Sequence, residues 1–278
     1  MKNLILSLSL LFAFQSISAQ SAWTRPKGEV YVQFGFHNIG NYQSLFSKEN
    51  NSGSLERVMS DRTLQLYGEV GLTDKLTLIA NIPYKTVQSG ESIVAIPEIP
   101  SGSLSAFGNV ELGLRRQILK GNFNVSAQLN VQANTSSYEV PLGLRTDLDA
   151  WSVLPSISIG RSSASYFAQA FVGYAWHSND YSHHFRLGVE AGISILDKHW
   201  LIFFVDIYDS LENGDRVDSP NNLLTGLFLN NQQYGGIGLK AIFELPANLS
   251  LNLGVGGAIF GDLVASQGAT SIGVGWKF

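Results

Sequence analysis

The chain contains 278 residues, of which 18 are basic and 22 acidic, and it has no cysteine. Only 14% of its residues are charged although 45% are hydrophobic, whereas about a quarter of an ordinary soluble domain is charged. The lack of cysteine excludes a disulfide scaffold, a cysteine metal site and a lipid anchor on cysteine. A net charge of −4 without a basic cluster argues against a nucleic-acid partner.

Residues 1–19 have the pattern of a secretory signal peptide. Lys2 supplies a positive charge, and the 11 apolar or mostly apolar residues from Leu4 to Phe14 form a stretch too short to cross a bilayer. Polar and small residues follow as far as Ala19, which predicts cleavage after this residue. We therefore expect residues 20–278 to form one exported domain, in which residues 20–27 are a short leader. No later stretch is long and apolar enough to predict a membrane-spanning helix.

The rest of the chain alternates between apolar and polar residues, which is typical of half-buried strands. The segment 122–134 shows this best, because apolar side chains from Phe123 to Ala133 alternate with polar ones from Asn124 to Asn134. Most of the predicted strands are 12–15 residues long, and a tilted membrane-spanning strand needs about 9–11 residues. We predict strands at 28–40, 61–73, 75–86, 105–119, 122–135, 149–161, 164–177, 182–196, 198–211, 231–245, 247–260 and 268–278.

Short and long connections alternate along the chain. The short ones are 73–74, 120–121, 162–163, 197–198 and 246–247, and the long ones are 41–60, 87–104, 136–148, 178–181, 212–230 and 261–267. Outer-membrane barrels have this arrangement, with short periplasmic turns and longer extracellular loops. The sequence therefore predicts an all-β fold, an antiparallel transmembrane β-barrel of about 12 strands with both termini in the periplasm. Residues 88–104 could fold into the lumen or remain outside.

The charged residues fall on the polar face of the predicted strands, with Glu29 and Lys277 among them. Because a charge that faces lipid at mid-depth costs about 2–4 kcal/mol, the apolar face is expected to point outward. The charges would then form ion pairs across a narrow lumen, and these pairs either stabilise the barrel or set its selectivity. The candidate lumen-lining residues are Gln33, Gln65, Tyr67, Glu69, Glu111, Arg115, Gln128, Asn130, Gln169, Arg186, Glu190, Asp206 and Lys240.

Aromatic residues gather near the predicted strand ends on the outward face, as in the interfacial belts of membrane barrels. They are Phe123, Trp151, Tyr166, Tyr174, Trp276 and Phe278. The last six residues, Gly273 to Phe278, resemble the ending of bacterial outer-membrane proteins. This resemblance implies that Trp276 and Phe278 form a signal read by the barrel-assembly machinery.

Two further segments resemble known families. Trp23 to Gly35 is similar to the start of many transporter-like outer-membrane barrels of Bacteroidetes. Phe107 to Arg115 resembles a strand of the meta-pathway phenol-degradation family of outer-membrane transporters, although Asn109 and Arg116 depart from the family's usual residues. Val140 to Gly143 echoes that family's Leu-Pro-Thr-Gly stretch only in part. The resemblance implies passage of small hydrophobic or aromatic compounds across the outer membrane.

One polar string, His177 to Asp180, partly matches a motif of outer-membrane acyl hydrolases. In a strand, however, adjacent residues point to opposite faces, so His177 and Ser178 could not pair as base and nucleophile. A metal cluster of His177, Asp180, His183 and His184 is the second alternative for this region.

The sequence thus favours a passive channel or transporter for small molecules in the outer membrane of a Gram-negative bacterium, with membrane lipid around it. A structural or surface-interaction barrel with a closed lumen, whose loops 41–60 and 212–230 meet partners, stays open, as does the lipid acyl hydrolase. We expect no catalytic residue, no cofactor and no metal.

Overall fold

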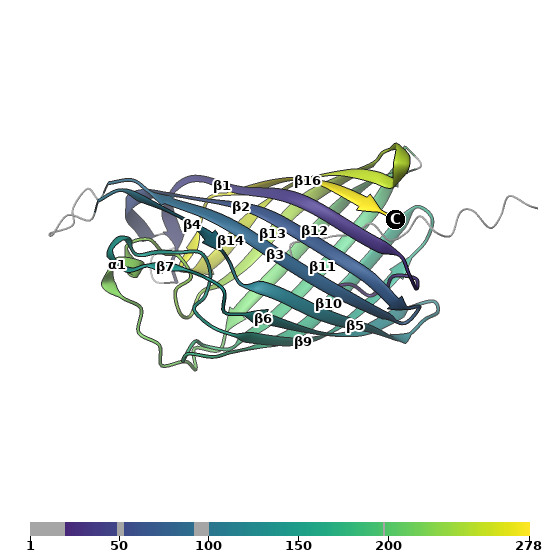
Figure 1. Ribbon diagram of the computed structural model, residues 1–278, viewed down its shortest axis with the longest axis horizontal. Helices are drawn as coiled ribbons and strands as arrows, with labels where there is room; N and C mark the ends of the chain where they lie inside the picture. The colour runs from purple at the N-terminus through teal and green to yellow at the C-terminus, as the bar shows by residue number, and fades with distance from the viewer. Residues whose placement is uncertain (1–19, 49–52, 92–99, 197) are drawn as a thin grey trace, which may run out of the picture.

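The computed structural model describes residues 20–48, 53–91, 100–196 and 198–278, which form a closed antiparallel β-barrel (Figure 1). Its sheet contains 14 strands, and β1 closes the wall by pairing with both β2 and β16. The 14 strands occupy 12 positions around the wall, which we call staves. Two strands add no position, because β4 and β5 lie end to end beside β3, and β15 is a two-residue strand beside β1. The predicted fold class is confirmed.

The strands of the wall are β1 (Val30–Phe46), β2 (Gly53–Thr73), β3 (Leu76–Ser89), β4 (Gly102–Phe107), β5 (Val110–Leu119), β6 (Asn124–Ala133), β9 (Ser152–Ser162), β10 (Tyr166–His177), β11 (His184–Ile195), β12 (His199–Ser210), β13 (Gln233–Glu244), β14 (Leu249–Asp262), β15 (Val264–Ala265) and β16 (Ala269–Lys277). Short elements lie between them: β7 (Tyr138–Glu139), η1 (Val140–Leu142), β8 (Leu144–Arg145), α1 (Pro220–Leu223) and η2 (Pro246–Asn248). Within the described ranges, no helix has the length and apolar character needed to cross a membrane.

The two ends of the barrel differ. Short connections such as 74–75, 163–165 and 245–248 lie at the end where β1 begins and β16 finishes, which we call the turn end. The longer connections, including those that carry α1 and β7, lie at the opposite end, which we call the loop end (Figure 1). The segregation of connection lengths that the sequence indicates is therefore present.

The outer surface of the wall is apolar. Every stave exposes at least one large apolar side chain, because the residues of one face of each strand alternate with buried polar residues of the other. Five of the six aromatic residues predicted for the outward face are exposed, and Tyr174 packs beside Trp176 and Phe185. Taking one outward residue from each stave in turn, these are Phe34, Leu66, Leu78, Leu112, Leu129, Ile157, Val172, Val189, Phe203, Leu239, Val255 and Val274.

Several predicted boundaries are wrong. The segment 41–60 is not a free loop, because β1 continues to Phe46 and β2 already begins at Gly53. The two strands pair along this extension, where Leu45 lies opposite Gly53. The predicted loop 88–104 is shortened at both ends by β3 and β4, and its residues 92–99 lie outside the described residues. The predicted signal peptide and residue 197 of one predicted turn also lie outside them.

The strand predicted at 105–119 is interrupted between β4 and β5, at Gly108 and Asn109. The backbone N–H of Asn109 donates to Asp147 Oδ2 (3.0 Å), so it is not part of the strand ladder. Its side-chain amide donates to the carbonyl oxygen of Leu148 (2.7 Å) and accepts from the backbone N–H of Thr135 (3.1 Å). The break therefore ties the wall to the long connection between β6 and β9.

Candidate functional site

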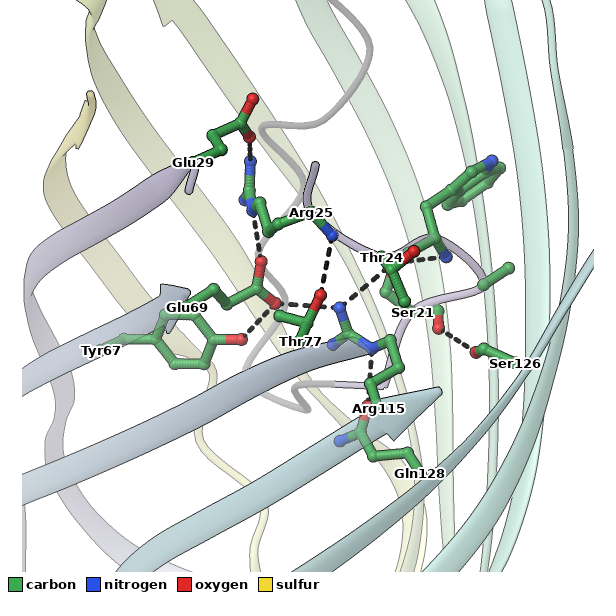
Figure 2. A network of polar contacts seen from close by, with 12 residues as sticks. Ser21, Thr24, Arg25, Glu29, Tyr67, Glu69, Thr77, Arg115, Ser126 and Gln128 are labelled. Carbon is green, nitrogen blue, oxygen red and sulfur yellow. Dashed lines mark hydrogen bonds and ion pairs between the residues drawn. The ribbon is translucent and has the colours of Figure 1, made fainter. Parts of the chain in front are cut away.

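The described chain begins inside the barrel. Residues 20–28, which we call the N-terminal plug, enter the lumen at the turn end (Figure 2). Inner-wall side chains bind the plug backbone: Gln117 Nε2 donates to the carbonyl oxygen of Ala22 (3.2 Å) and Ser126 Oγ to that of Ser21 (2.5 Å). The segment expected to be only a short leader is thus a structural part of the lumen.

A chain of alternating charges connects the plug to three strands. Arg115 Nη1 lies 3.0 Å from Glu69 Oε1, and the other oxygen of Glu69 lies 2.6 Å from Arg25 Nε of the plug. Arg25 Nη1 also contacts Glu29 (3.0 Å), whose second oxygen contacts Lys277 Nζ (3.0 Å). Arg25, Glu69 and Arg115 are each at most 4% exposed, so these pairs lie away from bulk water. Buried pairs of this kind lose several kcal/mol when one partner is removed.

Arg25 is the central residue of this chain (Figure 2). Burial lowers the pKa of its guanidinium, but the carboxylates of Glu69 and Glu29 outweigh this effect and raise the pKa above its ordinary value. The backbone N–H of Arg25 donates to Thr77 Oγ1 (2.8 Å), and its guanidinium lies 4.8 Å from the centre of the Tyr31 ring. The side chain and backbone of one residue therefore hold the plug against β1, β2 and β3.

Apolar contacts hold the tip of the plug. Ala22 and Trp23 pack in a buried cluster with Phe167 and Trp200, and the rings of Trp23 and Phe167 meet edge to face at 6.2 Å. Closer to β1, the plug passes so near to β2 that a Cβ on Gly71 would lie 1.9 Å from the carbonyl oxygen of Pro26. Only glycine allows this approach of the two backbones.

A second structure, the outer cap, lies at the loop end and is formed by residues 134–151 and 211–232. Its centre is the fully buried Asn222, whose Oδ1 accepts from Arg145 Nε (2.8 Å) and whose Nδ2 donates to the carbonyl oxygen of Leu227 (2.8 Å). The cap rests on the inner side of the extended strands through an apolar cluster. The buried members of this cluster are Tyr42, Leu45, Leu55, Met59, Val87, Leu144 and Leu227.

A cavity of about 350 Å³ lies in the lumen beside the plug, whose Gln20 lines it. Its wall is hollowed by glycines on β13, β14 and β16, including Gly236, Gly254 and Gly273. The rings of Phe171 and Phe204 also line it, and the ring of Phe204 lies over Gly238 and Gly256 of the same wall. The cavity is therefore lined by backbone and aromatic carbon as well as by polar side chains.

The charged groups of the cavity are paired. Lys240 Nζ lies 2.8 Å from Glu190 Oε1, and the other oxygen of Glu190 accepts from Gln169 Nε2 (2.8 Å). Asp206 Oδ2 lies 3.2 Å from Arg186 Nη2 and accepts from the Tyr234 hydroxyl (3.0 Å). The polar side of the cavity thus carries fixed dipoles and charges of both signs, and these charges neutralise each other in pairs.

The residues predicted to line the lumen lie on the inner face. They fall into three groups, which line the cavity, hold the plug, or form other contacts on the inner face. Seven of them line the cavity: Gln33, Gln65, Tyr67, Gln169, Glu190, Asp206 and Lys240. Glu69, Arg115 and Gln128 belong to the network that holds the plug. Arg186 pairs with Asp206, while Asn130 joins Gln128 to Glu111. Glu111 accepts from Asn130 and Gln132, so amides satisfy a carboxylate for which the sequence suggests a cationic partner.

Sequence reasoning missed Arg25 and Trp23, because residues 20–27 have no period that assigns them to a face. Phe167 and Trp200, the two aromatic residues against which the plug packs, were missed as well. They are apolar residues on the inner face, where the alternation predicts polar ones. A short polar leader that carries one tryptophan and one arginine was the only available signal.

The polar string His177 to Asp180, at the end of β10, does not form a catalytic arrangement. Ser178 Oγ accepts from the backbone N–H of Trp151 (2.9 Å), and the ring of His177 packs against that of His184 at 4.9 Å. Neither ring nitrogen of His177 has a hydrogen-bond partner among the described residues. No group of three or more potential metal ligands occurs in the part of the chain that the structure describes.

Comparison with known proteins shows to which family this barrel belongs. A family model described as "Putative MetA-pathway of phenol degradation" matches residues 12–262. The chain belongs to this family. The resemblance seen at Phe107 to Arg115 is thereby confirmed, whereas the suggested affinity with Bacteroidetes barrels stays a prediction. No curated protein sequence gives a significant match.

Solved structures share the fold. The crystal structure of an outer membrane channel from Pseudomonas putida F1 matches with a TM-score of 0.72 and 14% identity, covering 95% of this chain and 100% of that one. The translocator domain of the autotransporter NalP from Neisseria meningitidis has a TM-score of 0.55 and 12% identity, covering 91% and 90%. The KdgM porin has a TM-score of 0.53 and 7% identity, covering 89% and 99%. At these identities the likeness concerns the fold.

Proposed function

We propose that this protein is a passive channel of the Gram-negative outer membrane that admits small, mainly apolar or aromatic molecules. The observation that carries the proposal is the partly aromatic cavity in the lumen of a barrel whose exterior is apolar. Membership of the phenol-degradation family supports the solute class, and the fold shared with the Pseudomonas channel supports the location. In this orientation the turn end faces the periplasm and the loop end faces the outside. Trp276 and Phe278, beside the first strand, remain the proposed assembly signal.

The plug is the part of the structure that has to move for a solute to pass through the turn end. The outer cap consists of two segments with their own apolar cluster and buried amide centre. The plug is a single segment held by hydrogen bonds, ion pairs and one apolar cluster at its tip. Its displacement has to separate Trp23 from the cluster of Phe167 and Trp200, and Arg25 from Glu69, so these two anchors determine the cost of opening. The plug therefore makes the channel closed at rest and able to open.

Solute flux into liposomes tests this proposal. The parent protein is compared with a Trp23→Ala/Arg25→Gln variant, which loses the aromatic and ionic anchors of the plug. Small neutral aromatic molecules, sugars, amino acids and aromatic acids of graded size serve as probes. We expect slow, size-limited flux through the parent and flux at least about tenfold faster through the variant, because weakening a buried ion pair shifts the closed state by more than about 1.4 kcal/mol.

A heat-dependent gel shift establishes that both proteins are folded barrels. If neither protein passes any probe, the channel proposal fails and the alternative of a closed structural barrel takes its place. That alternative has one observation in its favour, since the plug lies in the lumen at the turn end and the outer cap lies at the loop end.

A further inference from the structure

One point of the plug is tied to the cavity by a chain of polar groups, which we call the latch. The backbone N–H of Ala22 donates to Gln169 Oε1 (3.2 Å), and Gln169 Nε2 donates to Glu190 Oε2 (2.8 Å). The other carboxylate oxygen of Glu190 accepts from Lys240 Nζ (2.8 Å). Resting on the channel function proposed above, we propose that Glu190 is a positioning residue of the channel, which acts through Gln169 to hold the plug in the lumen.

The strand register brings the members of the latch together. Gln169 on β10 and Glu190 on β11 lie directly opposite each other in the antiparallel ladder, where side chains on the same face are neighbours. Lys240 comes from β13 and reaches Glu190 across β12, with its ammonium 4.5 Å from the centre of the Phe204 ring. Ala22, Gln169 and Glu190 are all buried, so water has little access to the hydrogen bonds that join them.

The two ends of the latch determine where its acceptors have to lie. The ammonium of Lys240 and the backbone N–H of Ala22 only donate hydrogen bonds, whereas an amide side chain donates from its nitrogen and accepts at its oxygen. With a donor at each end, the two side chains between them are satisfied when one of them accepts on both sides. Glu190 is that residue, because both oxygens of a carboxylate accept. Its charge therefore makes Gln169 turn its nitrogen toward Glu190 and its oxygen toward Ala22.

The substitution Glu190→Gln would reverse this order. The oxygen of the new amide would accept from Lys240, so its nitrogen would face Gln169, which would then have to present its own oxygen to that nitrogen. The nitrogen of Gln169 would in turn meet the backbone N–H of Ala22, and two donors would face each other in a buried place. The plug would thus lose a hydrogen bond although no residue that touches it had changed.

The latch joins the cavity to the plug. Gln169, Glu190 and Lys240 all line the cavity, so a solute there meets the groups that set the polarity of the latch. The carbonyl oxygen of Ala22 is held separately, by Gln117 Nε2 of β5. Of these two contacts of Ala22, the one with β10 is therefore the one that depends on the cavity.

Amide hydrogen exchange in residues 20–28, measured by mass spectrometry on the refolded protein in detergent micelles, tests the latch. Glu190→Gln should accelerate this exchange roughly three- to tenfold, because one buried hydrogen bond of the plug is lost. The swap Gln169→Glu/Glu190→Gln keeps the net charge. Its carboxylate accepts from Ala22 and from the new amide, whose oxygen accepts from Lys240, so the swap should restore the parent rate. If Glu190 served only the stability of the barrel, moving the carboxylate to β10 would not restore it.

A second variant tests whether Glu190 acts through Gln169. Gln169→Met removes the contact with Ala22 while Glu190 keeps Lys240, so it should accelerate exchange in residues 20–28 by about the same factor as Glu190→Gln. Adding Glu190→Gln to Gln169→Met should then have no further effect. Parent-like exchange in β10 and β11 shows that each variant is folded, and if Glu190→Gln alone fails to fold, the swap and Gln169→Met decide.

Asp206→Asn is the matched control. Asp206 is another paired carboxylate of the cavity, but it accepts from Arg186 and from the Tyr234 hydroxyl rather than from Gln169. Its substitution should leave exchange in residues 20–28 unchanged.

Unchanged exchange in Glu190→Gln, or a swap that exchanges as fast as Glu190→Gln, overturns the latch. The channel function is judged separately by liposome flux. Flux with unchanged exchange leaves a channel without this latch, whereas accelerated exchange without flux, even in Trp23→Ala/Arg25→Gln, leaves a latch in a barrel that is not a channel.

Discussion

Glu69 is the residue on which the plug depends most. One carboxylate lies against the guanidinium groups of both Arg25 and Arg115, and it also accepts from the Tyr67 hydroxyl (2.8 Å). Its removal leaves two buried positive charges facing each other with Glu29 as the remaining carboxylate beside Arg25. A charge left without its partner in such surroundings costs several kcal/mol. The plug should therefore leave the lumen more often when Glu69 is neutral.

Glu69→Gln is expected to expose the plug, as measured by thiol labelling. The natural chain has no cysteine, so Ala22→Cys introduces a single reporter at a position that is fully buried. In the background with Glu69 intact, a membrane-impermeant maleimide should label this cysteine slowly. With Glu69→Gln the labelling rate should rise at least about tenfold, in line with a loss greater than about 1.4 kcal/mol.

Glu111→Gln is the matched control for this experiment. Glu111 is also a buried carboxylate of the inner wall, but its carboxylate oxygens accept from Asn130 and Gln132 of β6 rather than from the plug. It should leave the labelling rate unchanged. Equal rates for the two variants would show that the ion pairs of Glu69 do not hold the plug.

At the scale of secondary-structure elements, the interruption between β4 and β5 secures the outer cap. The side chain of Asn109 donates to the carbonyl oxygens of Leu148 and Ala150 and accepts from the backbone N–H groups of Thr135 and Ser136. In a continuous strand, the backbone groups of Gly108 and Asn109 would form hydrogen bonds with the neighbouring strands instead. The break thus exchanges ladder hydrogen bonds for a link between the wall and the cap.

Asn109→Ala should loosen the cap without unfolding the barrel. Four hydrogen bonds of the side chain are lost, each with a net contribution of about 1 kcal/mol. Amide hydrogen exchange within residues 134–151 should therefore accelerate by at least about tenfold, while exchange in β10 to β13 stays as in the parent. Asn124→Ala, at the turn end of β6, serves as the control. Unchanged exchange in 134–151 would mean that the cap is held by its apolar cluster alone.

At the scale of the whole molecule, the apolar exterior predicts how the barrel responds to charge. Val172 is 52% exposed and lies in the middle of β10, whereas Tyr166 is 46% exposed and begins the same strand. In a lipid bilayer an arginine costs about 2–4 kcal/mol at the midplane and about 0–1 kcal/mol near the interface. Position along one strand should therefore decide the effect of one substitution.

Denaturant unfolding in liposomes measures this difference. Val172→Arg should lower the free energy of unfolding by about 2–4 kcal/mol, and Tyr166→Arg by about 1 kcal/mol or less. The two variants share a strand, a face and a new side chain, so depth in the membrane is what separates them. Similar losses for both would contradict a membrane-embedded exterior.

The period-two pattern is enough to predict the wall of this barrel. Alternation determines which side chains share a face, and the cost of charge in lipid determines which face points outward. Residues such as Glu69, Arg115 and Lys240 can therefore be assigned to the inner face from the alternation alone. The number of staves and the contrast between the two ends follow from counting strands and connections.

Contacts between parts of the chain that lie far apart in sequence cannot be predicted in this way. The plug has no periodic pattern, so nothing in residues 20–27 indicates that Arg25 meets Glu69 on β2 or that Trp23 meets Phe167 on β10. The same holds for the extension of β1 and β2, whose inner face is apolar because the outer cap rests on it. The alternation within a strand shows which side chains face the lipid and which face the lumen. It does not show which other segment of the chain fills the lumen, and these contacts depend on that segment. Only the folded barrel, where volume and charge have to be matched across the lumen, decides that.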